Sequence, residues 1–171
     1  MADTLIIYYS RAGQNYVDGQ IKDLPKGNAR ILTDYLEELT GGDVFAVETV
    51  EPYPEDYMAC TEVAKKEQAA NARPALAAMP PALDGYDTVI LCGPCWWGSY
   101  PMAMFTALES LDFTGKKVLP VMTHEGSGMG NTAKDLRKLY KGAKIAKGLA
   151  VQGSAVSRAK GEVAAFLAKN K

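Results

Sequence analysis

The chain has 171 residues, of which 47% are apolar and 23% charged, and its formal net charge is −1. This length and balance predict one globular domain over residues 1–171, and the charge disfavours a nucleic-acid-binding surface, which would be basic. The same weak charge disfavours a strongly acidic carrier that attracts basic partners over long range.

Three cysteines, an odd number in a chain too large to need disulfides, favour a reducing compartment. The first apolar run, Leu5 to Tyr9, is too short for a signal-peptide core or a membrane span, and no basic segment precedes it. We therefore expect a cytoplasmic protein that contacts no membrane.

Short apolar runs alternate with segments of helical periodicity. The apolar runs, continuous as in strands buried on both faces of a sheet, predict strands over 4–9, 44–50, 88–92, 117–122 and 144–151, the last interrupted by Gly148. Apolar residues at helical spacing and helix-stop residues predict helices over 28–39, 55–71, 101–111, 132–140 and 158–169. Asn28 suits the N-cap of the first helix, and Pro101 suits the first turn of the third.

This alternation predicts an α/β fold: a doubly wound, five-stranded parallel sheet in the order 2-1-3-4-5, with helices on both faces. In such folds ligands bind outside the carboxyl ends of the strands, at the switch point of the sheet. The loops after the first, third and fourth strands are therefore the candidate site.

The loop after the first strand has the residues that a phosphate group needs. Ser10, Asn15 and the backbone amides near Asn28 offer a hydroxyl, a side-chain amide and the N-terminus of a helix. Between them, an Asp18-Gly19 turn signal predicts a hairpin over 16–21, folded over or beside the phosphate site. The alternatives are an exposed loop without a role and an Asn28 that only caps its helix.

The loop after the third strand contains adjacent tryptophans, Trp96 and Trp97, followed by Gly98. Tryptophan at the end of a sheet offers a flat, polarisable face to a flat ligand, and glycine lets the backbone approach closely. Trp97 is the expected ring contact because it directly precedes Gly98. The alternative is a tryptophan-rich cap over the sheet edge or a protein contact surface.

The loop after the fourth strand, residues 123–131, has glycines at alternate positions and the only histidine of the chain, His124. Glycines expose backbone N–H groups and permit positive φ, so this loop can hydrogen-bond the polar edge of a ring. His124 either donates to that edge or hydrogen-bonds within its own loop.

Cys92-Gly93-Pro94-Cys95 repeats the thioredoxin motif, but its surroundings disagree with that function. A reactive dithiol needs a cysteine exposed at a helix N-terminus, whereas Cys92 ends an apolar strand and the next helix begins only near Pro101. The sequence also lacks a G-x-x-x-x-G-K-[ST] phosphate loop, a G-x-G-x-x-G after the first strand and any cluster with metal-ligand spacing.

Together these segments resemble the flavodoxin-like family, and more closely its branch of short, provisionally named flavodoxins. The resemblance covers essentially the whole chain, and its specificity lies in the order and spacing of weak motifs. The matching stretches are YYSRAGQNYVDGQI, LPKGN, YPEDYMACTEVAKKEQAANARP, GPCWWGSYPMAMFTALESLDFTGK, THEGSGMG and GLAVQGS.

The resemblance implies a non-covalently bound FMN and assigns residues to each part of it. Its phosphate would be held by Ser10, Asn15, Asn28 and Ala29, with Tyr16 of the expected hairpin beside them. The isoalloxazine ring would be lined by Pro94, Cys95, Trp96, Trp97 and Gly98. Its polar edge would contact His124, Glu125, Gly126 and Gly128.

The chain departs from the family at two of these positions and at one neighbouring position. Relatives often carry Asn at the position of Cys95 and a hydroxyl residue at that of Ala29, and the latter change removes a phosphate ligand. Met129 stands in the loop where other flavodoxins have an aromatic residue over the second flavin face. One face is therefore expected to be open to a hydride donor or a quinone.

Two functions follow from the resemblance. The first is an electron-transfer protein that passes electrons between redox partner proteins, favoured by the small chain and the lack of a nicotinamide site. The alternative is an NAD(P)H-dependent FMN reductase acting on quinones or similar acceptors, favoured by the open face and weak net charge. A cofactor-free binding module that uses the tryptophan loop is the third class.

Overall fold

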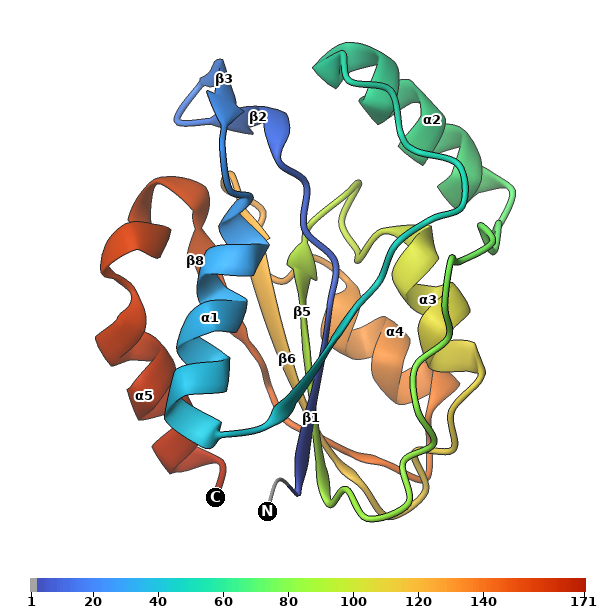
Figure 1. Cartoon of the computed structure of the whole chain (residues 1–171), viewed down its shortest axis with the longest axis vertical. Helices are drawn as coiled ribbons and strands as arrows, with labels where there is room; N and C mark the ends of the chain where they lie inside the picture. The colour runs from blue at the N-terminus through green and yellow to red at the C-terminus, as the bar shows by residue number, and fades with distance from the viewer. Residues whose placement is uncertain (1–2) are drawn as a thin grey trace.

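The computed structural model describes residues 3–171 and shows a mostly parallel central sheet between two layers of helices (Figure 1). Its elements are β1 (Thr4–Tyr8), β2 (Gly13–Val17), β3 (Gln20–Leu24), α1 (Asn28–Thr40), β4 (Asp43–Ala46), α2 (Tyr57–Ala69), β5 (Thr88–Pro94), α3 (Met102–Glu109), β6 (Lys117–His124), α4 (Thr132–Leu139), β7 (Lys144–Ile145), β8 (Leu149–Gln152), the 3-10 helix η1 (Gly153–Arg158) and α5 (Lys160–Lys169). Helices α1 and α5 cover one face of the sheet and α3 and α4 the other, while α2 extends beyond the carboxyl ends of the strands (Figure 1). No helix within residues 3–171 is both long enough and apolar enough to cross a membrane.

The strand order confirms the predicted topology. β4, β1, β5 and β6 lie side by side, and both β7 and β8 pair with β6, all in parallel register. β7 and β8 are the two halves of the predicted fifth strand. Between them Gly148 takes a left-handed φ of +95°, which interrupts the ladder where the sequence places its glycine.

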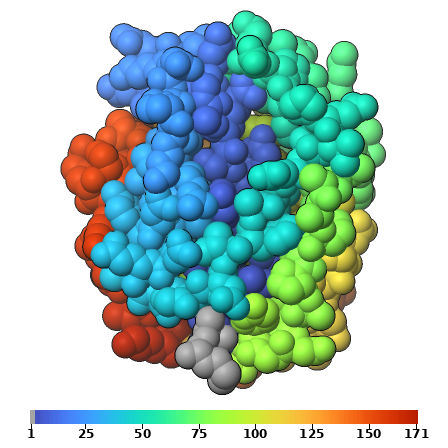
Figure 2. Space-filling model, in the orientation of Figure 1, coloured from blue at the N-terminus to red at the C-terminus, as the bar shows by residue number. Residues whose placement is uncertain are grey.

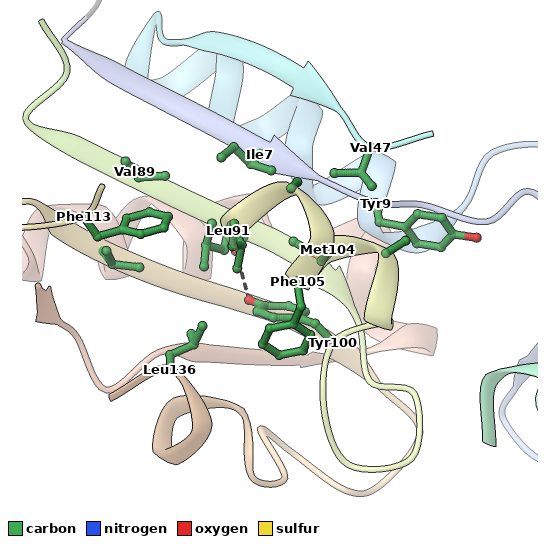
Figure 3. Packing of buried hydrophobic residues seen from close by; sticks show 14 of the residues in the cluster. Ile7, Tyr9, Val47, Val89, Leu91, Tyr100, Met104, Phe105, Phe113 and Leu136 are labelled. Carbon is green, nitrogen blue, oxygen red and sulfur yellow. Dashed lines mark hydrogen bonds between the residues drawn. The ribbon is translucent and has the colours of Figure 1, made fainter. Parts of the chain in front are cut away.

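The alternation of side chains along each strand builds two cores. In β1, Leu5 and Ile7 pack on the α3 and α4 side, whereas Ile6 packs on the α1 and α5 side. Figure 3 shows the first core, in which Tyr100 lies under Leu91. The buried Tyr100 hydroxyl lies 3.1 Å from the Leu91 carbonyl oxygen and 2.8 Å from that of Val121, so it fastens the end of the tryptophan loop to β5 and β6.

The predicted hairpin is also confirmed. β2 and β3 pair antiparallel across Asp18 and Gly19, whose φ values of +54° and +80° are those of a type I′ turn. The hairpin and α2 meet over the carboxyl ends of the strands, at the top of the view in Figure 2.

Several predicted element ends are wrong. The second strand stops at Ala46 instead of Val50, because the chain then leaves the sheet and Thr49 pairs with Leu76 in an isolated antiparallel bridge. Gly27, not Asn28, is the N-cap of α1, and Pro101 is the N-cap of α3 instead of its first helical residue. The predicted closing helix begins two residues later, at Lys160, after the unforeseen η1.

Candidate functional site

Two adjoining compartments lie at the carboxyl ends of β1, β5 and β6. The first has a volume of about 260 Å³ and is more polar, and the second, of about 390 Å³, lies between the hairpin and α2. They share the lining residues Arg11, Asn15, Tyr16, Tyr57, Cys95 and Trp96. The first is further lined by Asn28, Ala29, Pro94, Thr123, His124, Glu125 and Ser127, and the second by Ile21, Met58, Cys60, Thr61, Ala64 and Trp97.

The N-terminus of α1 opens into the first compartment. The Ser10 hydroxyl accepts a hydrogen bond of 3.1 Å from the Arg30 amide, so a residue twenty positions away caps this helix. Within residues 3–171 the amides of Asn28 and Ala29 have no hydrogen-bond acceptor. Two free N–H groups at the positive end of a helix form a place for an anion.

Gly27 is what lets the loop after β1 close on this helix. A Cβ at this position would lie 2.2 Å from Ser10 Oγ and 2.5 Å from the Arg11 carbonyl oxygen. A larger residue would therefore push the loop away from the helix and open the cradle around the free amides.

Arg11 brings a positive charge to both compartments. Its Nε donates to the Gln14 carbonyl at 2.9 Å, and its Nη2 donates to the carbonyls of Pro54 and Glu55, both at 2.8 Å. These bonds hold the hairpin against the segment that precedes α2. Sequence reasoning left Arg11 out because its partners Pro54 and Glu55 lie more than forty residues away in the chain.

The hairpin is fixed over the site by contacts with α2 and with the loop after β6. The Tyr16 and Tyr57 rings stack with centroids 6.0 Å apart. Glu125 accepts hydrogen bonds from the amides of Asp18 at 2.8 Å and Gly153 at 3.1 Å, so its carboxylate joins the hairpin turn to the start of η1. Glu125 thus lines the first compartment, and its two oxygens are already engaged by the backbone.

The tryptophan loop is a second type I′ turn. Trp97 and Gly98 have φ values of +55° and +85°, and the Trp96 amide donates to the Ser99 carbonyl at 2.7 Å. This turn sends the two indoles in different directions. Trp96 packs edge-on against Tyr9 and Tyr53, with centroids 5.2 and 5.1 Å apart, whereas Trp97 is 49% exposed.

The aromatic cluster of Tyr9, Tyr53 and Trp96 is hydrogen-bonded to the carboxylate of Glu67. The Tyr53 hydroxyl donates to Glu67 Oε1 at 2.7 Å, and partial burial raises the pKa of Glu67. Burial, with the Glu67 carboxylate, raises the pKa of Tyr53 far above its usual value, so this phenol stays protonated. The group is a firm support for Trp96.

The loop after β6 closes the other side of the first compartment. His124 Nδ1 accepts a hydrogen bond of 2.9 Å from the Gly126 amide, which in the neutral imidazole leaves Nε2 as the donor. His124 is thus hydrogen-bonded to the backbone next to it, and it also lines the first compartment. Ser127 Oγ donates to Cys95 Sγ at 3.2 Å and connects this loop to the tryptophan loop.

The structure brings most of the sequence-predicted site residues to these compartments. Those that line one or both are Asn15, Tyr16, Asn28, Ala29, Pro94, Cys95, Trp96, Trp97, His124 and Glu125. Those that line neither are Ser10, Gly98, Gly126 and Gly128, which shape the adjoining helix end and loops. The lining residues that sequence reasoning missed include Arg11, Tyr57, Thr123 and Ser127. Thr123, near the end of β6, and Ser127, in the loop after it, both lie within the predicted loop 123–131, so their position was a usable signal.

The cysteines of the Cys92-Gly93-Pro94-Cys95 stretch are in different environments. Cys92 is fully buried in β5, and burial raises the pKa of its thiol to about 12, whereas Cys95 is partly exposed. Neither cysteine lies at the start of a helix, because the next helix, α3, starts at Met102. No group of three or more metal-ligating side chains occurs in the described part of the chain.

A first prediction follows for these thiols. Because burial raises its pKa to about 12, the Cys92 thiol is almost wholly protonated, and so unreactive, near neutral pH. At pH 8, iodoacetamide is expected to alkylate Cys95 at least about tenfold faster than Cys92, as followed by peptide mass spectrometry. The control is the urea-unfolded chain, in which both should react alike. Equal labelling in the folded protein would contradict this account.

Comparisons with known proteins agree with this geometry. The family model described as Flavodoxin matches residues 25–169. A provisionally named flavoprotein from Bacteroides uniformis has 25% identity and a TM-score of 0.73 over 98% of each chain. A flavoprotein from Lactobacillus acidophilus in complex with FMN has 18% identity and a TM-score of 0.67, over 92% of this chain and 98% of that one. Oxidised flavodoxin 2 from Bacillus cereus shares the fold at 19% identity and a TM-score of 0.54, over 98% and 99%. No curated protein matches the chain.

Proposed function

The chain belongs to the flavodoxin family, and we propose that it is an electron-transfer protein that passes electrons between redox partners. FMN is its cofactor, as the family and the FMN complex of a structural neighbour support. One observation carries the proposal. The free amides of Asn28 and Ala29 at the N-terminus of α1 and the indoles of Trp96 and Trp97 line two adjoining compartments.

The residues present fit FMN at both of its ends. The amides of Asn28 and Ala29, with the charge of Arg11 nearby, suit the phosphate dianion. Ser10 acts as a positioning residue, because its hydroxyl caps the helix instead of lining the compartment. Asn15 keeps the loop around the phosphate in shape, since its side-chain amide donates to the carbonyls of Arg11 and Gly13.

At the other end the chain offers flat apolar surfaces and a small set of donors. Trp96 lines both compartments and Trp97 the second, so they are the proposed ring contacts, with Pro94 and Cys95. His124 has its Nε2–H free for the polar edge of the ring, and Gly126 and Gly128 add no side chain at their own positions beside it. Gly98 holds the two loops together, because its carbonyl accepts from the Asn131 amide at 2.8 Å.

When bound, FMN supplies the storage and release of electrons. The protein's part is to hold the phosphate, to orient the ring and to limit the access of water to it. Arg11 and Glu125 contribute by fixing the hairpin over the site. We place this activity in the cytoplasm, which the three free cysteines support.

One observation favours a second candidate, an NAD(P)H-dependent reductase of quinones or similar acceptors. The second compartment is apolar and open, and Tyr16, Ile21, Met58 and Trp97 at its rim are all substantially exposed. A planar substrate is able to reach this compartment from solvent.

The experiment that separates the two candidates is anaerobic reduction of the FMN-loaded protein. We expect dithionite to reduce it readily, potentiometric titration to resolve two one-electron potentials, and NADPH alone to act slowly. Rapid, saturable oxidation of NADPH in the presence of a quinone would show that the protein is a reductase and not an electron carrier.

The phosphate cradle gives a second prediction. FMN should bind at least about tenfold more tightly than riboflavin, since even one charge-assisted hydrogen bond contributes about 1.5 kcal/mol or more. Titration calorimetry with both ligands measures the difference. Added salt should weaken FMN and leave riboflavin unchanged, because screening acts on the phosphate alone. Equal affinities at low salt would mean that the α1 terminus does not bind phosphate.

A further inference from the structure

A hollow on the far side of Trp97 has the properties of a docking site. It has a volume of about 350 Å³, and its apolar lining is Trp97, Met102, Phe105 and Leu139. We call it the Trp97–Leu139 hollow. Two of its members are large apolar side chains at the surface, with Trp97 49% and Leu139 52% exposed. Exposed apolar groups that flank a concave surface are typical of protein contact sites.

Trp97 connects this hollow to the proposed flavin site, because its indole also lines the second compartment. The ring is firmly held: its Nε1 donates to the Thr61 carbonyl at 3.0 Å, and Lys65 Nζ lies 5.3 Å from the ring centroid. Its left-handed φ of +55° is unusual for so large a residue. The indole thus lies between the hollow and the second compartment although the backbone of Trp97 is in an unfavourable conformation.

The segment of the chain that contains α4 is strongly basic. Residues 134–147 carry one acid, Asp135, and the cations Lys134, Arg137, Lys138, Lys141, Lys144 and Lys147, all exposed. The other 157 residues carry 13 Lys and Arg against 19 Asp and Glu. The net charge of −1 is therefore the sum of one basic segment and an acidic remainder. None of these cations is in an ion pair within residues 3–171.

The cations come close to the hollow along α4. Lys138 lines it, and Lys134 lies one turn earlier on the same side of the helix. Arg73 also lines the hollow, and its Nε is paired with Glu109 at 3.1 Å. Asp135, the one acid in the lining, accepts a hydrogen bond of 3.3 Å from Ser99 Oγ. An apolar centre bordered by cations is complementary to an acidic surface with an exposed apolar patch, and the attraction also speeds encounter.

We propose that the Trp97–Leu139 hollow and the α4 cations Lys134 and Lys138 dock an acidic redox protein, which exchanges single electrons with the cofactor through the side on which Trp97 lies. This inference rests on the proposed function. In one direction the partner gives up an electron and is oxidised while the FMN-loaded protein takes it up, and the reverse transfer balances in the same way. The continuity through Trp97 favours a redox protein over an anionic membrane.

The test uses reduced [2Fe–2S] ferredoxin, a strongly acidic one, as the electron donor to the FMN-loaded protein in stopped-flow mixing. We expect the second-order rate constant to fall as ionic strength rises. The double variant Lys134→Glu/Lys138→Glu should lower it at least about tenfold at low salt. With basic cytochrome c as the electron acceptor, the same variant should react faster than the parent.

The matched control is Lys169→Glu/Lys171→Glu, which makes the same charge change at the exposed C-terminal end, on the α5 side of the sheet. It should leave the ferredoxin rate near that of the parent. The docking site is overturned if the α4 double variant leaves the rate constant with ferredoxin unchanged. It is also overturned if both double variants lower that rate constant equally. An α4 variant that slows only reduction by NADPH overturns it too, since the cations would then bind a dinucleotide.

Oxidation of each dithionite-reduced protein by neutral benzoquinone keeps the two proposals apart. If the parent exchanges electrons with benzoquinone and the charge reversals change nothing with ferredoxin, docking fails and the proposed function stands. If the FMN-loaded parent exchanges electrons with no acceptor, the proposed function itself fails. Calorimetry with FMN on every variant checks that the cofactor site is intact.

Discussion

Replacing Trp96 by Ala is expected to lower the free energy of unfolding by about 3 kcal/mol and to weaken FMN binding. The first effect follows from a lost aromatic side chain and the space that it leaves, which typically cost about 3–5 kcal/mol in a full core and less at a partly buried position. The edge-on contacts with Tyr9 and Tyr53 each add about 0.5–1.5 kcal/mol to that loss.

Trp97→Ala is the comparison variant. Its indole is half exposed and contacts α2 at Thr61 and Lys65, so we expect a loss of stability of about 1 kcal/mol or less. Urea unfolding without FMN measures the two losses, and calorimetry then measures FMN affinity, which should fall in both. Similar unfolding losses would mean that the Tyr9–Tyr53–Trp96 cluster does not support the loop.

These two tryptophans show where sequence reasoning stops. Their loop was identifiable because it follows a continuously apolar strand, and the carboxyl ends of parallel strands carry the ligand site. The preference for Trp97 as the ring contact rested on its position before Gly98. A type I′ turn sends neighbouring side chains apart, and it places Trp96 against Tyr53, from a distant segment. Sequence spacing does not contain that contact.

The elements themselves were largely predictable, because runs such as Thr4 to Tyr9 and Thr88 to Cys92 are too apolar for anything but a buried strand. The Asp18-Gly19 signal likewise specified its hairpin. The cap of α1 was missed for a physical reason: the Ser10 hydroxyl reaches the Arg30 amide through the fold, so the local candidate, Asn28, was not needed for it. Arg11 and Glu125 were underestimated similarly, since their partners are backbone groups of distant segments.

Gly130 is the glycine of the loop after β6 at which a side chain would be least tolerated. Its φ is +55°, and a Cβ there would lie 2.4 Å from the carbonyl oxygen and 2.9 Å from the carbonyl carbon of Gly98. These are backbone atoms and cannot turn aside as a side chain would. The same carbonyl accepts the amide hydrogen bond of Asn131, so this close approach joins the two loops that line the site.

Gly130→Ala is therefore expected to lower the free energy of unfolding by about 2–4 kcal/mol. About 1 kcal/mol comes from the left-handed φ, and the rest from displaced backbone. FMN affinity should fall more than about tenfold, because the tryptophan loop and the loop after β6 move apart. The control is Gly128→Ala, which has a similar φ of +62° but nothing within 4 Å of the added Cβ, so only the conformational cost of about 1 kcal/mol applies. Urea unfolding and FMN calorimetry on both variants decide the matter. If the two lose the same stability, contact between the loops at Gly130 is not what holds the site together.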